Sequence, residues 1–386
     1  MTSSSDPLGL SRRDWEDRMT GWGLPAFRGR QVFDALHGRA ERTMAGIHEV
    51  PRELRERLER EMPIVLPAVV RREPSRDGSV KYGLRLSDGA LVEAVYMPGD
   101  AAVAQVNEFT DARAGTAAEP AARAKEVGPT GPAQRFTVCL SSQTGCAVDC
   151  AFCVTGRLGG GRNLSAGEIV GELYAVLDDA ERTAEGMRVV FMGMGEPFLN
   201  PEGVLPALAV LFEILPPRRV TVSTSGITPA FELFAALPRR PNLAVSLNAA
   251  DDETRSALMP INRTYPLEGL LRALAAWPLE PRRRITIEYV AIAGRNDSTE
   301  DARRLARLLR GLNVKVNVIP LNEDPVYLPG WRRPEDAVIE RFAGTLVDAD
   351  VPVTVRRSRG PDASAACGQL KGRTVDPRKR VPVPRS

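Results

Sequence analysis

The sequence predicts an α/β protein built on a partial, TIM-like (β/α)6 barrel, preceded by an N-terminal helical segment and a short β extension. Two patterns predict this class. From residue 136 onward, apolar runs rich in Val, Ile and Leu alternate with helical stretches, which is typical of a parallel sheet covered by helices. Polar residues follow four of these runs, at the end of a barrel where an active site is expected.

The N-terminal residues 1–65 are expected to form a helical accessory domain. Val32, Phe33 and Leu36 lie on one face of a helix, and residues 52–61 are charge-rich at helical spacing. These patterns indicate at least two helices before the first strand.

A β linker, residues 66–135, is expected next. Strands are predicted at 80–86 and 90–97, joined by a Ser-Asp-Gly turn. Residues 107–134 are rich in Ala, Gly, Pro and Glu and lack apolar periodicity. We expect this insert to be disordered or loosely held.

The core, residues 136–357, carries the alternating pattern. Its predicted strands are 136–140, 188–192, 219–223, 243–247, 285–291, 314–319 and 351–355. A helix predicted at 168–179 begins with Ser165 and Glu168, which have the spacing of a capping box.

The last segment, residues 358–386, is expected to be a loop carrying Cys367, followed by a basic tail. Six Lys or Arg residues against one Asp follow Gly368. A basic tail suits a phosphate backbone, although such tails are commonly just solvated.

Three of the five cysteines stand together as Cys146, Cys150 and Cys153, in a C-x3-C-x2-C triad. Three thiolates can hold three corners of a [4Fe–4S] cube and leave one iron open to a ligand. A structural zinc site would instead close its tetrahedron with a fourth Cys or His. Both histidines, His37 and His48, lie about a hundred residues upstream, so the triad favours a cluster over zinc.

The composition narrows the class of protein further. An odd number of cysteines, five in 386 residues, does not suggest a secreted disulfide framework. The chain starts without an apolar signal core, and no run of about 18 apolar residues occurs. We therefore expect no membrane span and a cytoplasmic location. For Cys139 and Cys367, a small buried side chain is the alternative to a functional thiol.

Polar segments follow four predicted strands at equivalent positions. They begin at Gly193, Ser223, Ser246 and Pro320. Each could be a plain turn, because Gly, Ser, Asn and Pro are common turn residues. Four in succession are better explained as one polar rim around a ligand, and glycine at 193 and 195 would let the backbone approach that ligand closely.

These segments resemble the RlmN/Cfr family of radical S-adenosylmethionine (SAM) RNA adenine methyltransferases. The cysteine triad after the first barrel strand is a feature of the wider radical SAM superfamily. The resemblance covers about residues 25–372 outside the insert. Its more specific motifs begin at Cys139, Gly193, Ser223, Met259, Thr286, Asn296 and Ala365.

The resemblance implies a [4Fe–4S] cluster held by Cys146, Cys150 and Cys153. Its open iron would chelate the amino and carboxylate groups of SAM, and reduction would cleave SAM to a 5′-deoxyadenosyl radical. An adenine ring carbon that carries hydrogen is neither acidic nor strongly nucleophilic. Radical addition, which depends on a cofactor, therefore suits such a target better than polar methyl transfer.

The resemblance also implies roles for the remaining cysteines. Cys367 would first accept a methyl group from one SAM molecule, since a thiolate is a good nucleophile. The radical from a second SAM would abstract hydrogen from that methyl group, and the carbon radical would add to adenine. Cys139 would release the product through a transient disulfide with Cys367. Glu93 matches the proton acceptor of the family.

The residues that would contact SAM are implied in the same way. They are Gly195, Glu196, Ser223, Ser246, Leu247, Asn248 and Asn322. Asn248 departs from the family, which usually has His after Ser-Leu. Asn keeps a donor and an acceptor but cannot be protonated, which leaves open a divergent relative that acts on another RNA.

The function implied is methylation of C2 of an adenosine in 23S rRNA, with tRNA as a second substrate. We expect a monomer that takes electrons from a reductant such as flavodoxin or ferredoxin, with the N-terminal segment binding RNA. Within the family, the alternative is the Cfr type, which methylates C8 of the same rRNA adenosine. From another class, the alternative is a non-catalytic iron–sulfur or zinc protein that binds RNA.

Overall fold

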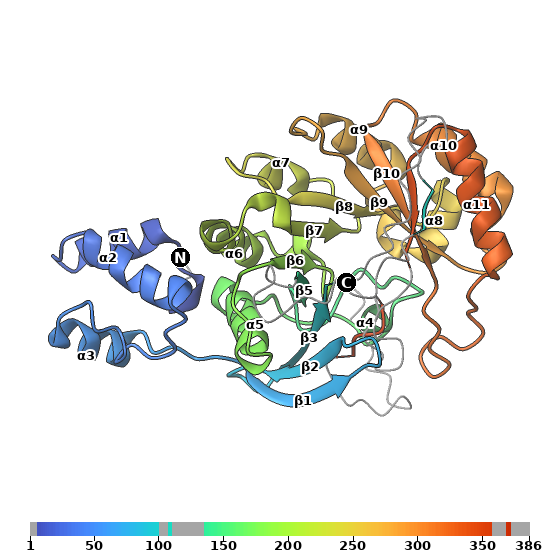
Figure 1. Ribbon diagram of the computed structural model, residues 1–386. Helices are drawn as coiled ribbons and strands as arrows, with labels where there is room; N and C mark the ends of the chain where they lie inside the picture. The colour runs from blue at the N-terminus through green and yellow to red at the C-terminus, as the bar shows by residue number, and fades with distance from the viewer. Residues whose placement is uncertain (1–5, 100–106, 110–134, 357–367, 372–386) are drawn as a thin grey trace, which may run out of the picture.

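A single curved sheet runs through the molecule (Figure 1). The computed structural model describes residues 6–99, 107–109, 135–356 and 368–371, with the side chains of 107–109 left out of that description. The strand order is β1-β2-β3-β5-β6-β7-β8-β9-β10-β11-β4. The strands are β1 (Ala68–Pro74), β2 (Val80–Arg85), β3 (Leu91–Pro98), β4 (Asn107–Phe109), β5 (Phe136–Leu140), β6 (Met187–Phe191), β7 (Val220–Thr224), β8 (Asn242–Ser246), β9 (Ile285–Ala291), β10 (Val314–Pro320) and β11 (Val353–Val355).

Helices alternate with the strands from β5 onward (Figure 1). The α-helices are α1 (Arg12–Gly21), α2 (Phe27–Phe33), α3 (Arg52–Glu61), α4 (Val154–Arg157), α5 (Ala166–Asp179), α6 (Pro201–Ile214), α7 (Ala230–Ala235), α8 (Asp252–Leu258), α9 (Leu267–Ala276), α10 (Thr299–Leu308) and α11 (Asp336–Asp348). The shorter helical turns are η1 (Pro7–Gly9), η2 (Asp34–Gly38), η3 (Pro197–Leu199), η4 (Pro217–Arg219) and η5 (Pro260–Arg263).

The strands from β5 to β11 form a parallel array in sequence order, which confirms the predicted partial barrel of six strand–helix units. Alternation along β10 explains the two faces of this array. Val314, Val316 and Val318 are buried, whereas Lys315 is exposed and Asn317 partly exposed. Because side chains alternate across a strand, one face of β10 packs into the core and the other faces a polar interior.

The β extension supplies the antiparallel edge next to β5. In it, β1 pairs with β2, β2 with β3, and β3 with β5. The predicted strands 80–86 and 90–97 correspond to β2 and β3. Predicted and observed strand ends differ by at most two residues. The sequence patterns missed β1, in which no residue is fully buried and the exposed alternate positions are Ala68, Val70, Arg72 and Pro74.

The predicted insert requires a correction at its start. Residues 107–109 form β4, antiparallel to the short strand β11 at the other edge of the sheet. An edge strand presents unpaired backbone N–H and C=O groups, and another segment can pair with these groups without any apolar pattern of its own. Residues 110–134 lie outside the described residues, so the prediction for them stays a prediction.

The N-terminal segment is helical, as predicted, and projects to one side of the barrel (Figure 1). Its buried side chains, including Trp15 and Phe33, belong to the same apolar core as those of α5 and the sheet. His37 joins the two parts, because its Nδ1 shares a hydrogen bond of 2.6 Å with the hydroxyl of Tyr174 on α5. Among the described residues, none of the helices combines the length and apolar character needed to cross a membrane.

We predict that His37 makes stability depend on pH. Burial, then the charges of Arg42 and Arg12, lowers the pKa of His37 from 6.5 to about 3. His37 thus stays neutral in the folded protein, while the unfolded chain takes up a proton below pH 6.5. Stability from this group is therefore present above pH 6.5 and lost as the pH falls toward 3. Between pH 7 and pH 5 the free energy of unfolding should fall by about 2 kcal/mol through His37.

Chemical denaturation of the wild type and of His37→Gln at the two pH values checks this. Gln cannot be protonated, so the variant should lack this part of the pH dependence. The same change of unfolding free energy with pH in both proteins would contradict the prediction.

Candidate active site

The three cysteines of the triad lie on one loop between β5 and α4. Backbone hydrogen bonds hold this loop: Cys146 N donates to Gly159 O at 3.0 Å and Cys153 N to Cys150 O at 3.0 Å. A further bond, 2.8 Å from Ala151 N to Leu258 O, ties the loop to the end of α8. Burial raises the pKa of Cys146 and Cys150, and the neighbouring charge of Cys153 raises it further. The loop therefore brings the three thiols close to one another.

The donor set fits an iron–sulfur cube. Each corner iron of a cube takes its own thiolate, so three ligands can lie further apart than around one ion. No group of three or more His, Cys, Asp or Glu side chains in the described part of the chain is arranged to hold a metal ion. Three thiols on one partly exposed loop remain a suitable donor set for a [4Fe–4S] cluster.

One cavity joins the triad to the polar rim. Cys146, Cys150 and Cys153 line it together with residues from the carboxyl ends of β6, β7, β8, β9 and β10. Five of the predicted SAM contacts lie in this lining: Gly195, Glu196, Ser223, Ser246 and Asn322. Among the predicted site residues in this lining, Cys146 and Asn322 lie furthest apart in the sequence, at 176 positions.

Gly193 and Gly195 allow the loop after β6 to lie against the cysteine loop. A Cβ atom on Gly193 would lie 2.6 Å from Leu140 O, and one on Gly195 would lie 2.6 Å from Gln143 Cβ. Gly195 also has a φ of +95°, which side-chain-bearing residues rarely adopt. Sequence reasoning expected these glycines to admit a ligand. In the structure they admit the neighbouring backbone as well.

Glu196 links the loops after β6 and β7. Its side chain is buried, and its carboxylate accepts hydrogen bonds from Phe198 N at 2.9 Å and Ser225 N at 2.7 Å. Burial raises the pKa of Glu196, while these two backbone hydrogen bonds oppose that shift. The carboxylate therefore fixes the polar rim, and it also lines the cavity.

Arg255 on α8 forms hydrogen bonds to the backbone of the polar rim. Its guanidinium is fully buried. It donates to the carbonyls of Ser225 at 2.7 Å, Leu247 at 3.1 Å and Ser246 at 3.2 Å, and to Asn262 Oδ1 at 2.7 Å. Burial lowers its pKa to about 10. Sequence reasoning missed Arg255, because nothing in the local pattern marks one arginine of a charged helix as buried.

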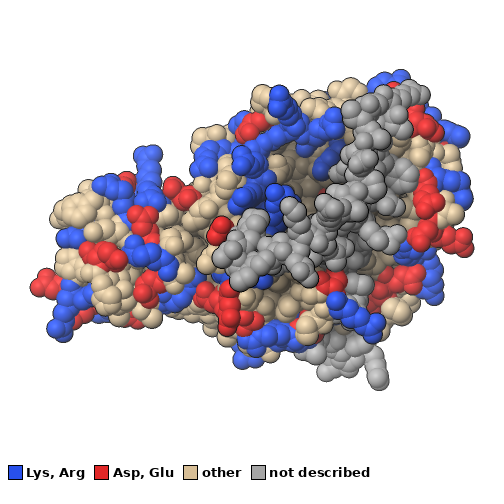
Figure 2. Space-filling view, in the orientation of Figure 1, with Lys and Arg blue, Asp and Glu red and all other residues tan. Residues whose placement is uncertain are grey.

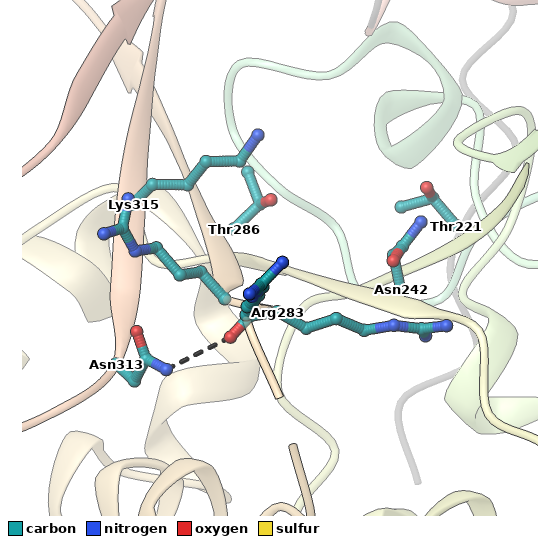
Figure 3. Close-up of a pocket in the computed structure, with 8 residues that line it drawn as sticks. Thr221, Asn242, Arg283, Thr286, Asn313 and Lys315 are labelled. Carbon is teal, nitrogen blue, oxygen red and sulfur yellow. Dashed lines mark hydrogen bonds between the residues drawn. The ribbon is translucent and has the colours of Figure 1, made fainter. Parts of the chain in front are cut away.

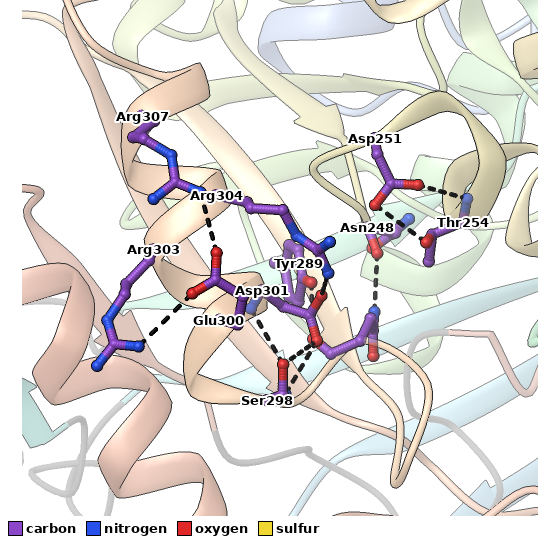
Figure 4. A network of polar contacts seen from close by, with 11 residues as sticks. Asn248, Asp251, Thr254, Tyr289, Ser298, Glu300, Asp301, Arg303, Arg304 and Arg307 are labelled. Atoms are coloured by element: carbon purple, nitrogen blue, oxygen red, sulfur yellow. Dashed lines mark hydrogen bonds and ion pairs between the residues drawn. The ribbon is translucent and has the colours of Figure 1, made fainter.

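Leu247 and Asn248 are placed differently from the expectation, since neither lines the cavity. Both are fully buried. Asn248 Oδ1 accepts from Val290 N at 2.7 Å, and Asn248 Nδ2 donates to Met259 Sδ at 3.0 Å. Its carbonyl accepts from Asn296 Nδ2 at 2.7 Å (Figure 4). The expected contact of these two residues with SAM stays a prediction, and the structure gives Asn248 a structural role.

The geometry explains why Asn suits position 248. Its φ is +60°, a region in which Asn is enriched among non-glycine residues. One side chain must accept a bond and donate another, and an amide does both. Asn248 acts as a structural tie between the loops after β8 and β9.

Glu93, the expected proton acceptor, lies on β3 and is buried. Its two oxygens accept hydrogen bonds from Arg71 Nη2 at 2.7 Å and from the backbone N of Lys371 at 2.8 Å. Glu93 does not line the cavity. It instead holds the C-terminal strap, by which we mean residues 368–371.

The strap lies against the cysteine loop. Val154 N donates to Gly368 O at 2.7 Å, and the hydroxyl of Thr155 donates to Leu370 O at 2.7 Å. Gly368 and Leu370 line the cavity. Cys139 on β5 is buried in an apolar cluster that includes Leu370. Cys367, the residue before the strap, lies outside the described residues.

Glu288 is a further residue of the cavity that sequence reasoning did not assign to the site. Its carboxylate is buried and accepts from Asn317 Nδ2 at 2.7 Å. Burial raises its pKa, and the charge of Arg356 opposes this. The available signal was a single carboxylate inside an otherwise apolar predicted strand.

The comparisons with known proteins decide the family. The Radical SAM superfamily matches residues 140–309. A "Dual-specificity RNA methyltransferase RlmN" of Anaeromyxobacter dehalogenans is 41% identical over 375 residues, covering 94% of this chain and 91% of that protein. A protein of the same name from Sorangium cellulosum is 42% identical over 377 residues, covering 94% and 95%. The chain belongs to the RlmN family.

The solved structures agree with this assignment. The crystal structure of a radical SAM methyltransferase from Sphaerobacter thermophilus matches 95% of this chain and 99% of that chain. The TM-score is 0.79 at 38% sequence identity. The fold and the cofactors of the chain, a [4Fe–4S] cluster and SAM, are therefore those of a radical SAM methyltransferase.

We predict that Asn248→Ala lowers stability rather than SAM affinity. The substitution removes two buried hydrogen bonds and leaves Val290 N without its partner, which should cost about 2 kcal/mol of the free energy of unfolding. Ser246→Ala, at the end of β8, is the matched control: Ser246 lines the cavity, so its substitution should lower SAM affinity with little change in stability. Denaturation and equilibrium SAM binding measure the two quantities. Reduced SAM affinity at unchanged stability in Asn248→Ala would contradict this structural role and support the expected contact with SAM.

Proposed function

We propose that this protein methylates C2 of an adenosine in 23S rRNA, and in tRNA, by way of an S-methylcysteine. One observation carries the proposal: in a chain of the RlmN family, the cysteine triad and five residues of the polar rim line a single cavity. The names of the relatives, dual-specificity RNA methyltransferases, support two RNA substrates.

The proposal assigns the cluster to Cys146, Cys150 and Cys153, which supply three thiolates and leave one iron open. It assigns SAM to the polar rim, namely Gly195, Glu196, Ser223, Ser246 and Asn322. When bound, the cluster supplies the electron that makes radical chemistry at a ring carbon possible. The protein's part is to hold SAM beside the triad and to exclude water from the buried side of the cavity.

The methyl carrier in this proposal is Cys367. Two facts about its surroundings support that role: Gly368, the next residue, lines the cavity, and Leu370 packs with Cys139. Cys139 would then resolve the product by a transient disulfide with Cys367. Glu93 would accept the proton. It accepts a hydrogen bond from Lys371 N, in the strap that directly follows Cys367.

The remaining assignments are also proposals. Residues 1–65 would be an accessory RNA-binding domain and residues 136–357 the radical SAM core. The basic residues after the strap would contact RNA phosphates. We further propose a cytoplasmic monomer that is reduced by a flavodoxin or a ferredoxin.

We predict that the reconstituted protein, given SAM, a reductant and 23S rRNA or tRNA lacking the modification, produces 2-methyladenosine. The reason is that a radical formed on a cysteine-bound methyl group can attack a carbon that polar transfer does not reach. Mass spectrometry of the digested nucleosides separates 2-methyl- from 8-methyladenosine. Cys367→Ala should give neither product while the cluster still cleaves SAM.

The other outcomes are equally specific. Production of 8-methyladenosine would move the protein to the Cfr type. Methylation by Cys367→Ala at the wild-type rate would remove the S-methylcysteine from the mechanism. SAM cleavage without any methylated adenosine would contradict the proposed substrate.

A further inference from the structure

A second hollow opens at the amino ends of β7 to β10, the opposite end of the barrel from the cysteines. Its volume is about 710 Å³, within the range typical of ligand sites. Four of its eight lining residues are cationic, and none is acidic. We call the four, Arg282, Arg283, Arg284 and Lys315, the basic mouth. Lys and Arg side chains gather over this part of the molecule in Figure 2, and Figure 3 shows the lining.

The basic mouth and the active-site cavity lie at opposite ends of the same barrel. Thr286 on β9 lines the mouth, and Glu288, two residues further along the same face, lines the active-site cavity. Thr286 is also the register partner of Lys315 on β10. At about 3.3 Å per residue, Thr286 and Glu288 lie roughly 7 Å apart along β9, and the whole seven-residue strand spans roughly 20 Å.

The charges of the mouth are only partly neutralised. Arg283 forms an ion pair of 2.9 Å with Glu280 and donates to Arg240 O at 3.1 Å. The side chains of Arg282, Arg284 and Lys315 form neither a hydrogen bond nor an ion pair with any other described residue, and the charge of Lys315 acts on the buried Glu288 further along the barrel. Cations held around one hollow repel each other, so an anion bound among them would relieve that repulsion.

The backbone at Arg282 points to a use for this side chain. Its φ is +65°, in the left-handed region. Glycine adopts this conformation without strain, whereas an arginine is strained in it. It belongs to a turn closed by a hydrogen bond of 3.0 Å from Arg283 N to Glu280 O. Backbone strain at a residue beside cationic side chains that form no ion pair indicates a role in binding more than a role in folding.

We propose that the basic mouth binds a phosphate group in the backbone of the RNA substrate. Guanidinium groups match the geometry of phosphate oxygens, and the hydroxyls of Thr221 and Thr286 add neutral donors to the same hollow. A folded RNA that reaches the cysteine end with its target adenosine extends well beyond 20 Å. It can therefore touch both ends of the barrel. The inference rests on the RNA substrate proposed above.

The test compares two double variants that remove equal charge. Arg282→Gln/Arg284→Gln takes two cations from the mouth. Arg303→Gln/Arg307→Gln takes two from α10, where both arginines already pair with Glu300 at 3.5 and 3.0 Å. Fluorescence anisotropy with a 23S rRNA fragment containing the target adenosine gives the affinity of each as a function of salt.

In the mouth variant we expect RNA affinity at about 0.1 M salt to fall roughly ten-fold. The slope of the logarithm of affinity against the logarithm of salt concentration should become shallower by about 1 to 2, as when one or two phosphate contacts are lost. The α10 variant should bind as the wild type does. Thermal unfolding verifies that each protein is folded, and Lys315→Gln provides a single-site variant on a neighbouring strand.

Wild-type affinity and salt slope in the mouth variant and in Lys315→Gln would overturn the proposal. If inorganic phosphate bound to the wild type but lost its affinity in the mouth variant, while RNA binding stayed unchanged, the site would serve a small phosphate ligand and the RNA assignment would be wrong. The mass spectrometry of nucleosides from RNA treated with the wild type tests the proposed function independently of these affinities. Absence of methylated adenosine there would refute the proposed function without altering what the affinity series says about the mouth.

Discussion

The arrangement of the active site depends on the buried guanidinium of Arg255. Its hydrogen bonds hold the carbonyls of Ser225, Ser246 and Leu247, on the loops that follow β7 and β8. A buried cation is costly unless its hydrogen bonds are made, so these loops cannot move independently. Because Ser225 and Ser246 line the cavity, the spacing of the polar rim follows from this one side chain. The charge of Arg255 also lowers the pKa of Cys150, opposing the rise caused by burial.

Sequence patterns predict strands and helices, which depend on the local order of apolar and polar residues. They miss buried polar side chains whose partners lie far away in the sequence. The strands of the barrel were predictable to within two residues because they are nearly continuous apolar runs. Five rim residues were predictable because polar residues at the carboxyl ends of parallel strands meet at one edge. Arg255 and Glu288 were not, since no local pattern says that a charged side chain turns inward. The orientation of a side chain is also hard to predict from sequence. The place of Asn248 after β8 was predicted, but the direction of its side chain depends on a left-handed backbone conformation.

The interior of this barrel has a hollow at each end, unlike the packed interior of a closed barrel. Along β9, Thr286 lines the hollow at the amino end and Glu288 lines the cavity at the carboxyl end, where Asn317, its register partner on β10, donates a hydrogen bond to it. The amino end is cationic, whereas the carboxyl end carries the thiols and the buried carboxylate of Glu196. The strap then joins the carboxyl end to β3 through Glu93. One open sheet thus supplies a cofactor cavity at one end and a candidate phosphate site at the other.

Arg255 is expected to position the polar rim for SAM beside the cysteines. Arg255→Lys tests it most directly, because Lys keeps the charge but lacks the planar fork that reaches several carbonyls at once. The measurement is equilibrium SAM binding to reconstituted protein, together with iron content per chain. We expect wild-type iron content, since the three cysteines are untouched, and SAM affinity lowered about ten-fold, as when roughly 1.4 kcal/mol of binding free energy is lost. Wild-type SAM affinity in the folded variant would show that Arg255 does not position the rim for SAM.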